Sequence, residues 1–219
     1  MYTIKNLFDL EHTIARKYLE NYEYPWEALP EIKNFIRELI EKLDRNEYTE
    51  YKKDVWVHKS ATIAPTADVN GPAIIGPKSE IRHCAYIRGN AIIGEGCVIG
   101  NSCEVKNAVI FDKSQVPHFN YVGDSILGFH AHMGAGSIVS NLKSDGKNVT
   151  IRVGDVKIPT NLRKFGAIIG DNVEVGCNSV LNPGTIVGKN SNIYPLARVR
   201  GLVPERSIYK DEDNIVEKK

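Results

Sequence analysis

The sequence predicts a mostly β fold, a parallel β-helix whose coils are built from very short strands. A large apolar residue stands at every sixth position from Val57 to Phe111, whereas a helix repeats near 3.6 residues and a strand repeats at two. Four positions after each of these residues stands a small one, from Ala61 to Cys103. Two interlocked repeats of this kind are typical of a solenoid in which three hexads make one coil of about 18 residues.

The large residue of each hexad is expected to fill the interior, while the small residue lets the chain turn a corner. Glycine often follows the large residue, as at Gly94 and Gly100, because it tolerates unusual backbone dihedrals. The count breaks at residues 117–120, which we interpret as an insertion of four residues that bulges the wall. The expected interior positions beyond the break are Tyr121, Leu127, Met133 and Val139, followed by Ile169, Val175, Leu181, Val187, Ile193 and Val199.

The repeat occupies the greater part of the chain. We assign residues 53–205 to the β-helix, with an excursion at about 141–162 where the pattern fades into a polar stretch. Residues 206–219 form a charged C-terminal tail in this prediction, and such ends are often mobile.

The first part of the chain, residues 1–52, lacks the repeat and is predicted to be a helical N-terminal cap. One helix is expected from Leu7 to about Tyr22. A second is expected after Pro30, because the apolar residues that follow it keep helical spacing. We expect this pair to cap the prism or to pack on a neighbouring chain, and a role in substrate binding is the alternative.

Composition narrows the classes of partner. With 25% charged residues and a net charge of +1, the chain gives no reason to expect nucleic acid or an anionic membrane as partner. The first residues lack the pattern of a signal peptide, and no run reaches the 18 or so apolar residues of a membrane span. The four cysteines include no CxxC pair, which indicates packed, reduced side chains and a cytoplasmic location.

Basic residues take the place of glycine after three of the large residues, at Arg82, Arg88 and Lys106. Arg88 and Lys106 are separated by three hexads, the length of one coil, so they are expected to stack on one face of adjacent coils. Two stacked cations favour a shared anion such as a phosphate. The alternative interpretation is a pair of solvated surface charges.

Histidines supply the candidate chemistry. His118 lies on the expected bulge, where a neutral imidazole could act as a base, and Tyr121 could orient it or line the substrate. A surface histidine bound to a backbone carbonyl is the alternative. His130 and His132 raise the question of zinc, but zinc needs three or four converging ligands, so no metal is expected.

Several motifs resemble one family, the left-handed β-helix, hexapeptide-repeat acyltransferases. The resemblance is strongest to the acetyltransferase domain of the bifunctional N-acetylglucosamine-1-phosphate uridyltransferase/glucosamine-1-phosphate acetyltransferase and its stand-alone relatives. The motifs are IR at 87–88, GNSCEVKNA at 100–108, HFNYVGDS at 118–125, MGAGSIVSN at 133–141 and IGDNVEVGCNSVLNPGTIVG at 169–188.

The resemblance implies a homotrimer with sites between neighbouring prisms, and transfer of acetyl from acetyl-CoA to an amino sugar phosphate or a nucleotide-linked amino sugar. It also implies a role for each matching residue. The implied catalytic residues are His118, as general base, and Asn141. The implied substrate contacts are Arg88, Lys106, Tyr121 and His132. The implied acetyl-CoA contacts are Gly134, Ala135, Gly136, Cys177, Pro195 and Lys210.

This chain departs from the family pattern at four positions. His132 replaces an asparagine, Leu142 a tyrosine, Cys177 a serine and Pro195 a small residue, so the acceptor sugar stays open. No glycine-rich nucleotide-binding segment precedes Val57, so no uridyltransferase activity is expected. Two other classes remain: a non-catalytic sugar-nucleotide-binding or scaffold homologue, and a zinc enzyme similar to γ-carbonic anhydrases.

Overall fold

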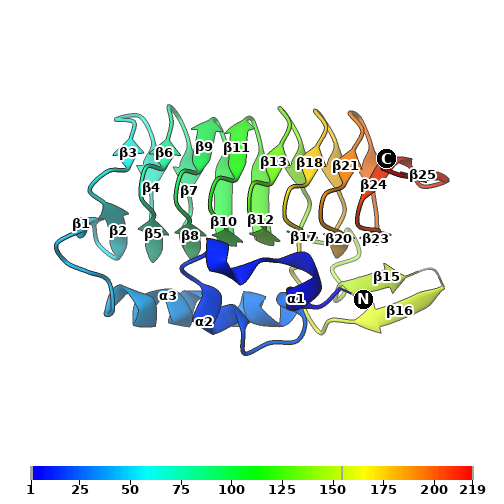
Figure 1. The fold of residues 1–219 in the computed structure, drawn as a ribbon, viewed down its shortest axis with the longest axis horizontal. Helices are drawn as coiled ribbons and strands as arrows, with labels where there is room; N and C mark the ends of the chain where they lie inside the picture. Colours follow the sequence, from blue (N-terminus) through cyan, green and yellow to red (C-terminus); the bar gives the residue numbers. More distant parts are fainter. Residues whose placement is uncertain (1, 154, 219) are drawn as a thin grey trace.

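The computed structural model describes residues 2–153 and 155–218, which form a solenoid of parallel strands with a helical segment along one side (Figure 1). The coils stack in near-constant register. Thr62 pairs with Glu80, and Glu174 pairs with Asn192, each pair being separated by exactly three hexads of the sequence. The predicted fold class, a mostly β hexapeptide-repeat solenoid with a short N-terminal helical region, is confirmed.

The strands form three faces of a prism. The first face contains β2 (Val55–His58), β5 (Ala73–Ile75), β8 (Ala91–Ile93), the second halves of β10 (Glu104–Ile110) and β12 (Tyr121–Leu127), β17 (Ala167–Ile169), β20 (Thr185–Val187) and β23 (Leu202–Val203). The second contains β3 (Thr62–Ile63), β6 (Glu80–Ile81), β9 (Val98–Asn101), β11 (Gln115–His118), β13 (His132–Met133), β18 (Glu174–Val175), β21 (Asn192–Ile193) and β24 (Ser207–Asp211). The third contains β4 (Asp68–Val69), β7 (Tyr86–Ile87), the first halves of β10 and β12, β14 (Ile138–Val139), β19 (Val180–Leu181) and β22 (Arg198–Val199).

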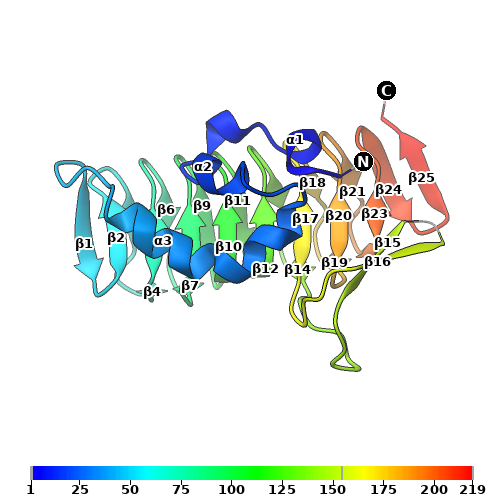
Figure 2. The same ribbon diagram turned by 90° about the horizontal axis from the view of Figure 1, so that it is seen from below.

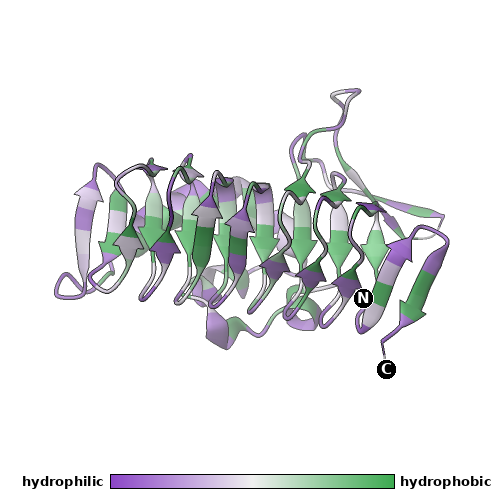
Figure 3. Ribbon diagram, turned by 90° about the horizontal axis from the view of Figure 1, so that it is seen from above, coloured by the Kyte–Doolittle hydropathy of each residue, from purple (hydrophilic) through white to green (hydrophobic). Residues whose placement is uncertain are grey.

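The interior of the prism is a continuous apolar core. Ile81, Ile87, Ile93, Ile99 and Val105 are at most 1% exposed and belong to one cluster. Two-residue strands such as β6 join one exposed polar residue to one buried apolar residue, and apolar and polar segments follow one another along the coils in Figure 3. The sixfold repeat therefore has the physical origin expected from the sequence, since one large residue per hexad fills the interior.

Two predicted interior positions are wrong. Ile110, not Phe111, faces the core, and Phe111 packs outward against Phe8 with ring centroids 5.0 Å apart. Val122, not Tyr121, is the next inward residue on β12. Residues 117–120 are not an insertion, because β11 stays in register with β9 through His118 and Asn101. Instead, Val105 pairs with Val122, one position earlier than three full hexads would place its partner, so one hexad is a residue short.

The first face carries an outward apolar row that the sixfold count does not contain. It consists of Ile74, Ile92, Val109, Ile126, Ile168 and Ile186, all at most 1% exposed. This row exists because the strands of the face between β2 and β23 have three consecutive buried residues, such as the Ala–Ile–Ile of β5, β8 and β17.

The N-terminal segment covers this row along the side of the prism (Figure 2). Its elements are α1 (Ile4–Leu7), the 3₁₀ turns η1 (Leu10–His12) and η2 (Pro25–Glu31), α2 (Arg16–Leu19) and α3 (Ile32–Ile40). The helix predicted from Leu7 to Tyr22 is wrong, because Asp9 and Thr13 accept hydrogen bonds from the backbone N–H groups two residues on and break it. No helix in the described part of the chain has the length and apolar character to cross a bilayer.

A buried carboxylate fastens the segment to the prism. Asp171 accepts hydrogen bonds from the backbone N–H groups of Asp9 and Phe129 at 2.7 and 2.8 Å, and pairs with Lys189 at 3.1 Å. Its own N–H donates to the carbonyl of Leu7 at 3.1 Å. Burial raises the pKa of Asp171, and these donors act against that rise.

Two hairpins complete the fold. Ile168 pairs with Ile186 after one regular coil of three hexads, but Ile126 pairs with Ile168 only after a much longer stretch of chain. That stretch contains one coil and, in addition, an excursion longer than a coil that leaves the prism. It contains the antiparallel hairpin of β15 (Thr150–Val153) and β16 (Val156–Pro159). At the C-terminal end, where a charged tail was predicted, β24 and β25 (Asn214–Glu217) form a second hairpin. At the other end β1 (Tyr48–Lys52) pairs with β2, so an antiparallel strand covers one strand edge at each end of the solenoid.

We predict that Ile168→Ala lowers the free energy of unfolding by about 2–5 kcal/mol, because it opens a cavity between the first face and the N-terminal segment. Urea denaturation followed by circular dichroism measures the change. Val156→Ala, at a side chain 61% exposed on the hairpin, is the control, expected within about 0.5 kcal/mol of wild type. Equal effects of the two variants would contradict the assigned packing.

Candidate functional site

Polar side chains gather along two corners of the prism. The basic corner, where the third face meets the first, carries Arg88, Lys106, Asp124 and Asn141. The backbone joins one coil to the next at this corner, and we call the position that each coil contributes a rung. The N–H of Arg88 donates to the carbonyl of Val105 at 2.8 Å, and Lys106 pairs with Gly123. The predicted stacking of Arg88 and Lys106 on adjacent coils is therefore present.

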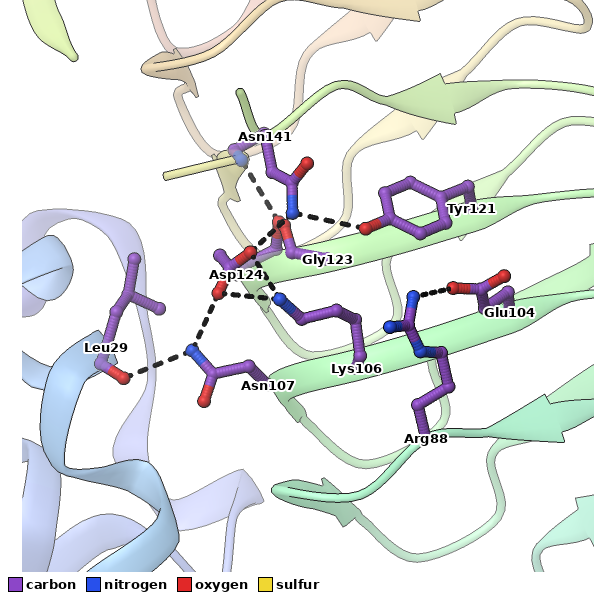
Figure 4. Close-up of polar contacts among 11 residues, drawn as sticks. Leu29, Arg88, Glu104, Lys106, Asn107, Tyr121, Gly123, Asp124 and Asn141 are labelled. Carbon is purple, nitrogen blue, oxygen red and sulfur yellow. Dashed lines mark hydrogen bonds and ion pairs between the residues drawn. The ribbon is translucent and has the colours of Figure 1, made fainter. Parts of the chain in front are cut away.

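Asp124 is the centre of the basic corner (Figure 4). The residue is 5% exposed, and its carboxylate accepts hydrogen bonds from Lys106 Nζ at 3.0 Å, from Asn107 Nδ2 at 3.0 Å and from Asn141 Nδ2. Arg88 pairs with Glu104 at 2.7 Å. Both stacked cations thus have carboxylate partners within the chain, so an incoming anion would share them with these acids.

A backbone carbonyl of the N-terminal segment contacts a side chain of this corner. Asn107 has a left-handed backbone (φ 47°) and its Nδ2 also donates to the carbonyl of Leu29 at 3.2 Å (Figure 4). Asparagine tolerates this conformation better than most residues. One amide group therefore joins η2 to the buried carboxylate of Asp124.

Tyr121 lies on the outward row of the third face, beside the basic corner. Its hydroxyl accepts a hydrogen bond from Asn141 Nδ2 at 3.1 Å. Burial, then the negative charges of Asp124 and Glu104, raise the pKa of Tyr121, so its phenol stays protonated and can donate a hydrogen bond to an anion.

The histidine corner, where the second face meets the third, carries His118, Ala135, Cys177 and Leu196. Backbone hydrogen bonds of 2.9 Å join its rungs: Gly136 donates to His118, Asn178 to Ala135 and Leu196 to Cys177. Lys210 extends the line, with its Nζ 5.6 Å from the ring centroid of Tyr194.

The structure thus places His118, Ala135, Cys177 and Pro195 on one line parallel to the prism axis, and Lys210 lies beside it on the next coil, in register with Tyr194. Two of the residues implied for acetyl-CoA have structural explanations of their own. Gly134 is buried, and a Cβ there would lie 2.6 Å from the carbonyl oxygen of Val175. Gly136 has φ 72°, a conformation that favours glycine.

Asn120 positions His118. Its buried side chain accepts a hydrogen bond from the backbone N–H of His118 at 3.0 Å and donates to the carbonyl of Gly134 at 2.8 Å. The His118 ring is exposed, and among residues 2–153 and 155–218 it has no side-chain hydrogen bond. The imidazole is therefore open to solvent.

Two bulky residues on the histidine corner have left-handed backbones, which is unusual for large side chains. Phe119 has φ 53° and Leu196 has φ 63°, and their side chains are 63% and 78% exposed. Strain of this kind clusters at functional sites. The same left-handed turn recurs on this corner at Cys84, Ser102 and Asn178, so Phe119 and Leu196 stand out by their large, exposed apolar side chains.

The two corners border the third face and do not meet within one chain. Asn101, the pairing partner of His118, comes five residues before Lys106, a span of up to about 16 Å for an extended chain. The face between them exposes apolar side chains at Tyr86, Ile138 and Val180.

His132 does not join either corner. It lies on the second face, where its Nδ1 is 2.7 Å from Glu174 Oε2. His130 lies at the remaining corner, in a left-handed conformation. No group of three His, Cys, Asp or Glu side chains in the described part of the chain is placed to hold a metal ion.

Sequence reasoning missed Asp124, Asn107 and Asn120. Asp124 follows Lys106 by another three hexads in the sequence, but this coil is one residue short and Lys106 pairs with Gly123, so the count alone does not place Asp124. Asn107 carried no such signal, since its partner Leu29 lies 78 residues away in the sequence.

Two family models match the chain. The GMPPB C-terminal domain matches residues 69–163, and the bacterial transferase hexapeptide (six repeats) matches residues 166–201. The bifunctional protein GlmU of Methanococcus maripaludis strain C5 is 33% identical over 205 residues, which are 92% of this chain and 50% of that protein. GlmU of Methanococcus aeolicus is 34% identical over 200 residues, 89% of this chain and 48% of that protein.

The chain spans about half the length of these curated relatives. Among solved structures, the acetyltransferase domain of PglB from Neisseria gonorrhoeae in complex with acetyl coenzyme A is similar, with a TM-score of 0.40 and 16% identity, over 85% of this chain and 67% of that one. PerB from Caulobacter crescentus in complex with CoA and GDP-perosamine has a TM-score of 0.39 and 16% identity, over 86% of this chain and 67% of that one.

We predict that Asp124→Ala lowers the free energy of unfolding by about 3–5 kcal/mol, because it leaves the largely buried ammonium of Lys106 unpaired. Glu104→Ala, which breaks the more exposed pair with Arg88, is the matched control and is expected to cost about 1 kcal/mol or less. Urea denaturation checks both. Adding Lys106→Met to Asp124→Ala should recover part of the loss, and no recovery would show that the charge of Lys106 is not the cause.

Proposed function

This chain is a hexapeptide-repeat β-helix protein related to the C-terminal regions of the GlmU and GMPPB proteins, and from this premise we propose that it is an acyltransferase. The proposed donor is acetyl-CoA. The proposed acceptor is the amine of an amino sugar phosphate or of a nucleotide-linked amino sugar.

The observation that carries the proposal is the line of the histidine corner. His118 stands at one end, and the rungs of Ala135, Cys177, Leu196 and the Tyr194–Lys210 pair follow it. Four rungs of about 4.8 Å span about 19 Å, which suits a long thin donor. With its phosphates near Lys210, the donor's thioester would lie near His118. The exposed Phe119 and Leu196 supply apolar contacts along this path.

The chemistry needs a base and a path for one proton. An amine attacks a thioester only when it is unprotonated. In the proposed step, the nitrogen of the amine bonds to the acyl carbon while His118 takes a proton from that nitrogen. The carbon–sulfur bond of the thioester then breaks. The CoA thiolate leaves and is protonated by the imidazolium. The exposed ring of His118, held by Asn120 through its backbone, fits this role.

The basic corner suits the phosphate of the acceptor. Arg88 and Lys106 offer cationic donors that their carboxylate partners hold in place, and Tyr121 offers a phenol. Asn141 bridges Tyr121 and Asp124 and would place the sugar. We propose that the acceptor lies over the third face between the two corners, and that neighbouring prisms of a homotrimer cover this face through its exposed apolar side chains, Tyr86, Ile138 and Val180.

The test is release of free thiol from acetyl-CoA with a panel of amino sugar phosphates and nucleotide-linked amino sugars. Release is expected with one acceptor class and falls by about 10²–10⁴-fold in His118→Ala, the usual contribution of a general base. His132→Ala, which changes a histidine on the second face, is the matched control and should stay close to wild type. Binding of acceptor without thiol release would instead favour a non-catalytic sugar-nucleotide-binding protein.

We also propose that this chain has no uridyltransferase activity. The described residues before β2 form helices, 3₁₀ turns and one strand that pack on the prism, and they supply no nucleotide-binding βα unit. Pyrophosphate release from UTP and a sugar 1-phosphate is therefore expected at the level of a no-enzyme blank. Release above that level would overturn this part of the proposal.

A further inference from the structure

A cavity of about 410 Å³ lies where the β15–β16 hairpin meets the prism, beyond the basic corner. Ser140 and Leu142, which flank Asn141, line one end of it, and Asn182 and Arg200 line the rungs beyond. The N–H of Ser140 donates to the carbonyl of Leu181, and that of Asn182 to Val199, both at 2.9 Å. The cavity therefore continues the basic corner by two further coils.

The hairpin is docked against these coils by two glycines. Gly201 has φ 80°, and a Cβ there would lie 2.9 Å from the carbonyl oxygen of Arg152. Gly184 has φ 81°, and a Cβ there would lie 2.8 Å from Cγ1 of Val149. Below them, the fully buried side chains of Val149 and Ile151 join the apolar cluster of the first face. The close approach puts Arg152 of the hairpin and Arg200 of the prism around one cavity.

The charge of the cavity is unbalanced. Its lining contains Lys143, Arg152, Arg200 and one carboxylate, Asp145. Asp145 pairs with Lys143 at 3.2 Å, while neither arginine forms an ion pair within residues 2–153 and 155–218. Three cations against one acid leave a net charge of +2. Two guanidinium groups around one space repel each other unless an anion lies between them.

We propose that this cavity binds the diphosphate of a ligand through Arg152 and Arg200. Guanidinium groups bind phosphate oxygens in a bidentate way, and Thr150, Ser140 and Ser144 add hydroxyl groups to the lining. Arg200 lies four rungs from Lys106 along the corner, about 19 Å. A ligand held there can thus extend toward Asn141.

The inference rests on the proposed function for the source of the diphosphate. It belongs either to the nucleotide of the acceptor, which would run along the basic corner, or to CoA, in which case the donor binds at this cavity and its phosphates do not lie near Lys210. Both share the same chemistry at Arg152 and Arg200. Binding measurements separate the two sources without any turnover.

The experiment is isothermal titration calorimetry of the full chain with inorganic pyrophosphate, UDP and CoA. Arg152→Ala and Arg200→Ala should each weaken pyrophosphate binding by about tenfold or more, because each removes a charge-assisted contact. Lys157→Ala removes the same charge from the opposite strand of the same hairpin, at the residue paired with Arg152, and is expected within about twofold of wild type.

Loss of UDP affinity alone in the arginine variants assigns the diphosphate to the acceptor, and loss of CoA affinity alone assigns it to the donor. Gly201→Ala keeps both charges but pushes the hairpin away, so it should weaken pyrophosphate binding as well. Equal losses in Lys157→Ala and Arg152→Ala, or no pyrophosphate binding by wild type, overturn the site. If binding follows the prediction while no acceptor yields thiol release, the site stands and the proposed function fails.

Discussion

Every part of this molecule depends on the backbone ladder that stacks one coil on the next at a fixed spacing. Because each coil keeps the register of the coil before it to within a single residue, a side chain on one coil lies above its counterpart on the next. Residues that are far apart in the sequence thus form columns parallel to the axis. The basic corner and the histidine corner are two such columns, so their geometry follows from the register of the ladder and needs no separate loop to build it.

The columns carry different kinds of group because the corners have different neighbours. The basic corner lies next to the N-terminal segment, which supplies the carbonyl of Leu29 and helps to bury Asp124. A buried carboxylate needs donors, and Lys106, Asn107 and Asn141 provide them. The histidine corner has no such cover among the described residues, so His118, Phe119 and Leu196 stay exposed. The partly buried charged groups of the basic corner and the exposed side chains of the histidine corner thus lie on opposite sides of the third face.

Departures from the repeat mark where the fold serves something besides its own packing. The hexad that is one residue short turns Phe111 outward toward the N-terminal segment. The excursion between β14 and β17 places Arg152 beside Arg200. Left-handed Phe119 and Leu196 are strained where asparagine would relax the backbone. The first two places gain a contact that the regular repeat does not provide, whereas Phe119 and Leu196 leave their apolar side chains exposed.

The sequence by itself determined the solenoid, because a sixfold alternation of large and small residues suits a prism interior and neither a helix nor a flat sheet. It also placed Arg88 above Lys106, since their spacing equals one coil. Only the tertiary structure decided that Asp124 pairs with Lys106, that His132 lies on another face and that the N-terminal helices lie along the prism. These outcomes depend on the outward side of each strand, which the inward repeat does not constrain. They also depend on contacts between segments too far apart in the sequence for any period to connect.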